Sequence, residues 1–111
     1  MDKKIIIEKK KNVYKNSLYA YGVLTLVYLI EKYQEKEHYE ECKIILDVII
    51  EQSEKLGIIL PKSYSNEFDE KLVHNLLNEL EQKGFDTIFY LEALHYYSKN
   101  IENEIKLCYV Q

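Results

Sequence analysis

At 111 residues, the chain is long enough for one domain with a single core and too short for two domains of usual size. Apolar residues make up 47% of it and charged residues 31%, a balance that excludes an intrinsically disordered chain and an integral membrane protein. The chain holds only three Gly and one Pro, too few for the turns of a many-stranded sheet. We therefore predict an all-α protein, a small antiparallel bundle of about four helices.

Charge is divided unevenly along the chain. Residues 1–15 hold six lysines against two carboxylates, a net charge of +4, whereas residues 16–111 hold nine lysines against 17 carboxylates, a net charge of −8. We predict a basic N-terminal arm over 1–15 and a helical bundle domain over 16–111. The triplet Ile5–Ile7 leaves three alternatives for the arm: a short strand, a frayed segment or the first turn of a helix.

The first predicted helix spans about Ser17 to Glu35. Asn16 or Ser17 is its expected N-cap, because either side chain accepts a hydrogen bond from a free amide of the first turn. The helix contains the uncharged run Leu18–Ile30, which resembles the apolar part of a signal peptide but is followed by no cleavage site and is too short to span a bilayer. We therefore expect this run to be a central core helix of a cytoplasmic protein.

A second helix is predicted from about Glu37 to Leu56, because polar residues recur at every third or fourth position and leave an apolar opposite face. Gly57 supplies the left-handed residue that commonly ends a helix. Residues 57–65 form the predicted loop, and a third helix begins after its cap residue Asn66 and ends at Gly84.

The last predicted helix runs from about Thr87 to near Cys108, with Asp86 as its N-cap. Apolar residues recur along it at helical spacing, and a break near Ser98–Asn100 is the alternative to one continuous helix. Because the loops are short, successive helices are expected to pack antiparallel.

Six residues of the first two predicted helices have the spacing of packing positions: Leu26, Leu29, Tyr33, Tyr39, Cys42 and Leu46. Their spacing resembles that of one tetratricopeptide helix pair, over less than a third of the chain. The chain departs from this pattern at Ile30, Ile49 and Glu54, and no second copy of the pattern follows. The resemblance therefore implies a similar helix-pair geometry and not membership of a repeat family.

The residue types that most often carry chemistry do not form a recognisable site. His38 and Cys42 lie four apart and Glu92 and His95 three apart, as in some metal-binding helices. A zinc site would need further ligands from His74, His95 and Cys108, which the sequence cannot place together, and a di-iron site lacks its second Glu-x-x-His copy. The chain also lacks a glycine-rich phosphate loop and a nucleophile motif. We predict no metal, no cofactor, no catalytic residue and no enzymatic activity, with reduced thiols at Cys42 and Cys108.

Nucleic acid and membranes are not the expected partners. The acidic body repels phosphate, and the chain has no Arg for bidentate recognition of guanine. The N-terminal lysines leave two alternatives, a weak contact with a phosphate backbone or folding back onto the acidic body. These lysines are Lys3, Lys4, Lys9, Lys10, Lys11 and Lys15.

Elimination leaves a non-enzymatic protein-binding role, with a basic surface on another protein as the expected partner. Likeness of size and charge alone favours a small inhibitor, immunity or anti-defence protein of a bacterium or phage. The alternatives are a housekeeping adaptor or a homodimeric structural protein. The predicted binding residues are an acidic stripe on the second helix and two of the chain's 11 tyrosines: Glu37, Glu40, Glu41, Asp47, Glu51, Glu54, Tyr14 and Tyr21.

Overall fold

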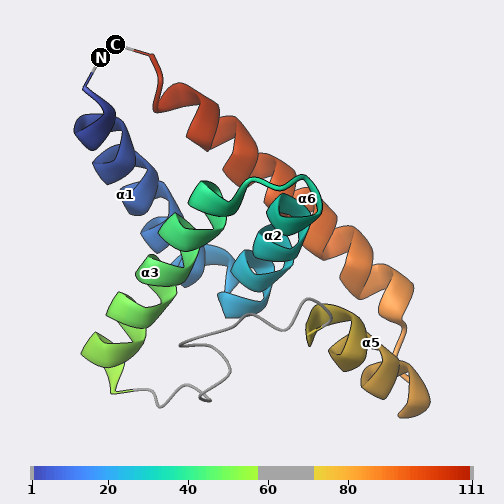
Figure 1. Cartoon of the computed structure of the whole chain (residues 1–111). Coiled ribbons are helices and arrows are strands. Elements are labelled where there is room, and N and C mark those ends of the chain that lie inside the picture. Colours follow the sequence, from blue (N-terminus) through green and yellow to red (C-terminus); the bar gives the residue numbers. More distant parts are fainter. Residues whose placement is uncertain (1, 58–71, 111) are drawn as a thin grey trace.

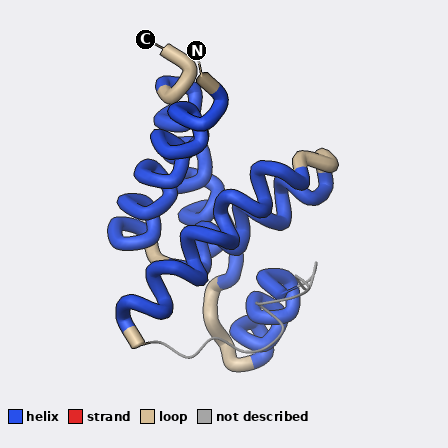
Figure 2. Tube along the Cα trace, turned by 60° about the vertical axis from the view of Figure 1, so that its left-hand side comes forward, coloured by secondary structure: helices blue, strands red, loops and turns tan. Residues whose placement is uncertain are grey.

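The structure, a computed structural model, describes residues 2–57 and 72–110 (Figure 1). Every regular element in these two ranges is an α-helix, and neither range contains a strand (Figure 2). The prediction of a small all-α bundle is confirmed. The described helices are α1 (Lys3–Tyr21), α2 (Val23–Glu35), α3 (Tyr39–Leu56), α5 (Leu72–Gln82) and α6 (Thr87–Leu107).

The N-terminal residues are helical from Lys3 onward. Asp2 caps α1, because its Oδ1 accepts a hydrogen bond from the backbone N–H of Lys4 at 3.0 Å. The predicted start at Ser17, with Asn16 or Ser17 as cap, is therefore wrong: Ser17 is buried inside α1, and its hydroxyl donates to the carbonyl of Val13 at 2.7 Å. Of the three alternatives for residues 1–15, the helix is the one that the structure contains.

Gly22 divides the predicted Ser17–Glu35 helix into two. Its backbone has φ 92° and ψ 165°, a conformation open essentially to glycine alone, and its N–H donates to the carbonyl of Leu18 at 3.0 Å. The uncharged run Leu18–Ile30 is thus shared between α1 and α2, and its α2 part lies in the core, as expected. None of the helices in the described ranges is long and apolar enough to cross a membrane.

The turn from α2 to α3 spans residues 36–38, so α3 begins at Tyr39 and not at the predicted Glu37. Glu37 has a positive φ of 60°, which a helix does not tolerate. At the other end, Gly57 adopts the predicted left-handed conformation, with φ 69° and ψ 21°. α2 and α3 pack against each other, as the helix-pair spacing implies.

Asp86 caps α6 as predicted, with its Oδ1 accepting from the backbone N–H groups of Ile88 at 3.1 Å and Phe89 at 3.2 Å. α6 is continuous to Leu107, and Ser98 within it is fully buried and donates to the carbonyl of Leu94 at 2.7 Å. The alternative of a break near Ser98 is therefore wrong. The predicted cap at Asn66 and the loop after Gly57 lie outside the described residues.

α6 connects two groups of helices. Its C-terminal half packs with α1, α2 and α3 around the larger core, and its N-terminal half packs with α2 and α5 around a smaller one. α1 and α6 run in opposite directions, so the two ends of the chain lie together (Figures 1 and 2). The larger core is formed by Tyr14, Leu26, Leu29, Ile30, Ile45, Val48, Ile49, Ile101, Ile105 and Cys108, and the smaller by Val27, Val73, Leu77 and Leu94.

Candidate functional site

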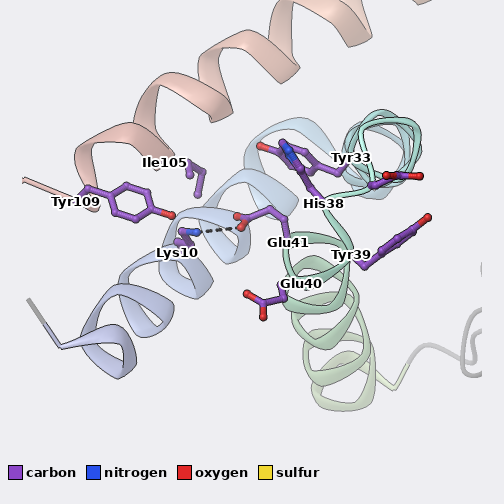
Figure 3. A pocket seen from close by; sticks show the side chains of 9 residues that line it. Lys10, Tyr33, His38, Tyr39, Glu40, Glu41, Ile105 and Tyr109 are labelled. Carbon is purple, nitrogen blue, oxygen red and sulfur yellow. Dashed lines mark hydrogen bonds and ion pairs between the residues drawn. The ribbon is translucent and has the colours of Figure 1, made fainter.

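A pocket opens where α1, the start of α3 and the end of α6 meet (Figure 3). Its volume of about 490 Å³ lies within the usual range of small-ligand sites. We call it the α1–α3–α6 pocket. It is lined by Lys10, Tyr33, Glu37, His38, Tyr39, Glu40, Glu41, Ile105 and Tyr109.

The turn between α2 and α3 supplies much of this lining. The backbone N–H of His38 donates to the carbonyl of Tyr33 at 2.8 Å, and that of Glu37 donates to Gln34 at 3.0 Å. These bonds fold the chain back tightly over three residues, so the turn and the first residues of α3 form one wall. The opposite wall comes from Tyr109, which follows α6.

An ion pair lies at the base of the pocket. Lys10 Nζ is 2.9 Å from Glu41 Oε2, and the two side chains are only 9% and 14% exposed. The other carboxylate oxygen of Glu41 accepts a hydrogen bond from the hydroxyl of Tyr14. The Lys10 ammonium also lies 4.8 Å from the centroid of the Tyr109 ring, within the range of a cation–π contact. Three elements distant in sequence are thus joined by one buried network.

The surroundings of Lys10, Tyr14 and Tyr33 determine the protonation states of these three side chains. Burial by itself lowers the pKa of Lys10, but hydrogen bonds to Tyr109 and Glu41 and the charge of Glu41 raise it above its usual value. Burial, with the nearby Tyr33 and Glu41, raises the pKa of Tyr14 far above that of a free phenol. Burial, with the charges of Glu102 and Glu41, raises the pKa of Tyr33 to about 12. Lys10 therefore stays an ammonium at neutral pH, and neither tyrosine becomes an anion.

The pocket carries an excess of negative charge. Its lining contains one lysine and three glutamates, and Lys10 and Glu41 compensate each other. Glu37 and Glu40 are exposed at the rim, and neither forms an ion pair within the described parts of the chain. A cation entering the pocket is therefore favoured over an anion.

The predicted acidic stripe is only partly available at the surface. Glu40, Glu51 and Glu54 are exposed and Asp47 is half-buried, whereas Glu41 turns inward to Lys10. Glu51 is paired with a lysine of α1: its Oε1 lies 3.3 Å from Lys11 Nζ, with side chains 53% and 28% exposed. We call Glu40, Asp47, Glu51 and Glu54 the acidic face of α3. The structure brings Glu37, Glu40 and Glu41 together at the pocket and leaves the other three farther along α3.

The two predicted binding tyrosines do not line the pocket. Tyr14 is fully buried, and its ring packs in the larger core. Tyr21 is half-buried and stacks on Tyr97, with ring centroids 4.7 Å apart. Sequence reasoning did not select Tyr33 or Tyr109 for the site; no local pattern marks them, because α2 and the end of α6 meet only in the folded chain.

The lysines of the N-terminal segment serve two different purposes. Lys10 and Lys11 fold back onto carboxylates of α3, which is one of the two alternatives that the sequence leaves. Lys3, Lys4 and Lys15 are exposed. Helical spacing explains why Lys10 is buried, because it lies four residues before Tyr14, on the side of α1 that faces the core.

Cys42 and His95, two of the residues considered for a metal site, have other partners. Cys42 Sγ donates to the carbonyl of Ile30 at 3.5 Å, and His95 Nδ1 lies 2.9 Å from Lys32 Nζ. In the part of the chain that the structure describes, no three His, Cys, Asp or Glu side chains gather so as to hold a metal ion. Both cysteines are free thiols, and burial raises the pKa of Cys42 and of Cys108.

Comparison with protein families, with curated proteins and with solved structures finds no match for this chain.

Proposed function

We propose that the chain is a non-enzymatic protein-binding module that docks a basic segment of another protein. The docking surface combines the rim of the α1–α3–α6 pocket with the acidic face of α3. By covering a basic surface of its partner, such a module acts as a small inhibitor, immunity or anti-defence protein. The observation that carries the proposal is the pair of exposed carboxylates of Glu37 and Glu40 beside an aromatic-lined pocket, neither of them in an ion pair within the described residues.

Long-range electrostatics support this role. The chain has a net charge of −4, and the acidic face concentrates part of the negative charge along one side of one helix. A surface of one sign attracts a partner of the opposite sign and speeds the encounter. Tyrosine rings beside such a surface add large, rigid contact area, as at many protein interfaces.

The state of the polar groups supports binding over catalysis. A general base or nucleophile is a side chain that is available to the substrate and whose pKa is shifted to suit its role near neutral pH. Lys10 is instead ion-paired, and the pKa values of Tyr14 and Tyr33 are raised away from neutrality. The ion pair of Lys10 with Glu41 and the hydrogen bond from Tyr14 join α1 to α3 at the base of the pocket, which is a structural role for these groups.

A charge-reversal experiment tests the proposal. The probe is a synthetic peptide of alternating Lys and Ser, and its association rate is followed by stopped-flow fluorescence at low and high salt. The variant Asp47→Lys with Glu54→Lys is expected to slow association by about tenfold at low salt, with a smaller difference at high salt.

The matched control changes the same net charge elsewhere. Glu92→Lys with Glu104→Lys reverses two exposed carboxylates of α6, away from the acidic face. The proposal requires this control to slow association much less. If both variants slow association equally, only net charge matters and no docking surface exists on α3.

A row of exposed apolar side chains on the N-terminal half of α6 favours a second candidate function, self-association. Ile88 is 71% and Phe89 68% exposed, Tyr96 is exposed seven residues after Phe89, and the exposed Phe85 precedes the helix. Sedimentation equilibrium over a range of concentrations tests for a homodimer. A dimer that dissociates in Phe89→Lys, but not in Tyr19→Lys on α1, would favour this function.

A further inference from the structure

We propose that the α1–α3–α6 pocket takes one cationic side chain of the partner, an arginine or a lysine, as the anchor of the docked segment. This inference rests on the proposed function and names the group that the pocket recognises. Three observations carry it: the lining residues, the charge balance and a contact that the chain already makes with its own lysine.

The lining provides flat rings next to carboxylates. Tyr33, Tyr39 and Tyr109 line the cavity, with His38 beside the ring of Tyr33 at a centroid distance of 6.0 Å. In Figure 3, Tyr109 and Tyr33 lie on opposite sides of the Lys10–Glu41 pair, so the cavity extends between aromatic side chains from two different parts of the chain. Ammonium and guanidinium groups are attracted to the faces of such rings.

The charge balance selects a cation over an anion such as phosphate. The nine lining residues include one lysine, Lys10, and three glutamates, Glu37, Glu40 and Glu41. Because Glu41 already compensates Lys10, an entering anion would meet the two exposed carboxylates of Glu37 and Glu40 at the rim. An entering cation would be attracted by the same two groups.

Lys10 shows how this environment holds an ammonium. Its Nζ is bound by the carboxylate of Glu41 at 2.9 Å on one side and lies 4.8 Å from the ring centroid of Tyr109 on the other. Glu37, Glu40 and Tyr39 also line the cavity, and within the described residues no ion pair joins either glutamate to a lysine. A long, flexible cationic side chain from a partner can enter the cavity and place its charge there.

The test uses a small probe that isolates the anchor from the rest of the partner. N-acetyl-arginine-N-methylamide is titrated into the ¹⁵N-labelled protein, and amide shifts are followed by NMR. We expect saturable shifts confined to the lining residues, with a dissociation constant on the order of millimolar, as suits a single side chain. The citrulline analogue has the same shape without the charge and should bind about tenfold more weakly, a difference of about 1.4 kcal/mol.

A second arm replaces arginine with N-acetyl-lysine-N-methylamide and identifies which cation binds more tightly. Glu37→Gln with Glu40→Gln should weaken binding of either probe about fivefold, because two attractive charges are removed while the shape is kept. Both residues are exposed, so the fold is retained. The matched control is Glu79→Gln with Glu92→Gln, which removes two exposed carboxylates of α5 and α6 outside the pocket and should leave the affinity unchanged.

Equal shifts with arginine and citrulline, or shifts by inorganic phosphate at the same amides, would overturn the inference, as would the absence of saturable shifts. The proposed function would be judged separately. If Asp47→Lys with Glu54→Lys still slows association of the basic peptide, docking on α3 stands and only the anchor fails. If the arginine probe binds but the peptide association does not depend on the acidic face, the anchor stands and the docking surface fails.

Discussion

Glu41 connects α3 to both Lys10 and Tyr14 of α1, so removing its charge tests how the pocket is held together. In Glu41→Gln the side-chain oxygen still accepts the hydrogen bond from the Tyr14 hydroxyl, but Lys10 loses its counter-charge. Lys10 is only 7% exposed, so its ammonium cannot regain full hydration without moving.

The size of the effect follows from this burial. Breaking a fully buried ion pair costs about 3–5 kcal/mol, because the remaining charge is left uncompensated. The Lys10 and Glu41 side chains keep 9% and 14% of their exposure and border an open pocket. We therefore expect Glu41→Gln to lower the free energy of unfolding by about 2–3 kcal/mol, somewhat less than for a fully buried pair.

A double-mutant cycle separates the pair from the residues around it. Lys10→Met leaves the Glu41 carboxylate without its cation and is expected to cost about 2 kcal/mol. The double variant Lys10→Met with Glu41→Gln leaves no uncompensated charge, so its stability should lie within about 1 kcal/mol of the wild type.

The assay is urea unfolding followed by circular dichroism at 222 nm. Urea is preferred over guanidinium because it leaves ionic interactions unscreened, and an unchanged slope with denaturant shows that the folded and unfolded states remain comparable. If the two single losses simply add in the double variant, with less than about 0.5 kcal/mol of coupling, the buried network does not act as a unit.

Two further predictions concern stability. Burial raises the pKa of Tyr14, and burial with the charges of Glu102 and Glu41 raises the pKa of Tyr33 to about 12. Above pH 10 the folded state therefore keeps protons that the same tyrosines release in the unfolded state. The free energy of unfolding should be at its full value below pH 10 and fall as the pH rises toward 12. Urea titrations across this range measure the fall, which should be smaller in Tyr14→Phe, and a constant stability would contradict it. Gly22→Ala should lower the free energy of unfolding by about 2 kcal/mol and Gly57→Ala by about 1 kcal/mol, since φ 92° with ψ 165° is less accessible to alanine than φ 69° with ψ 21°. A new Cβ meets no heavy atom within 4 Å at either site, so equal losses would show that backbone conformation is not the cause.

The helical class was predictable because it depends on local patterns. The spacing of polar residues in α3, the left-handed Gly57 and the cap at Asp86 each act within a few residues, and all three appear in the structure. The start of α1 was missed because Lys10 interrupts the apolar side of the helix at a buried position. Its burial depends on Glu41, 31 residues away, and no local pattern reports such a partner.

The division at Gly22 and the pocket were missed for related reasons. A single glycine in an apolar run is often tolerated inside a helix, so the sequence does not reveal that the chain turns there. Periodicity placed Glu41 at the edge of the acidic stripe, but only the packing of α1 beside α3 turns it inward. Tyr33 and Tyr109 share a pocket through tertiary contacts alone, and the sequence treats them as two tyrosines among 11.

The pairing of α1 with α3 also determines how much of the acidic face a partner can use. Lys11 lies 3.3 Å from Glu51 and so compensates one carboxylate of that face. The pair is exposed, and exposed pairs contribute about 0–1 kcal/mol, so Lys11→Met should leave the stability nearly unchanged. It should also free Glu51 and make the surface more negative.

If the acidic face of α3 steers a basic partner, Lys11→Met is expected to speed association of the Lys-Ser peptide by about two- to threefold at low salt, and less at high salt. The matched control is Lys99→Met, which removes one exposed lysine of α6 and changes the net charge equally. A larger acceleration for Lys11→Met than for Lys99→Met would locate the attraction on α3. Equal acceleration would mean that the peptide responds to net charge, and the pairing of Lys11 with Glu51 would then have no influence on binding.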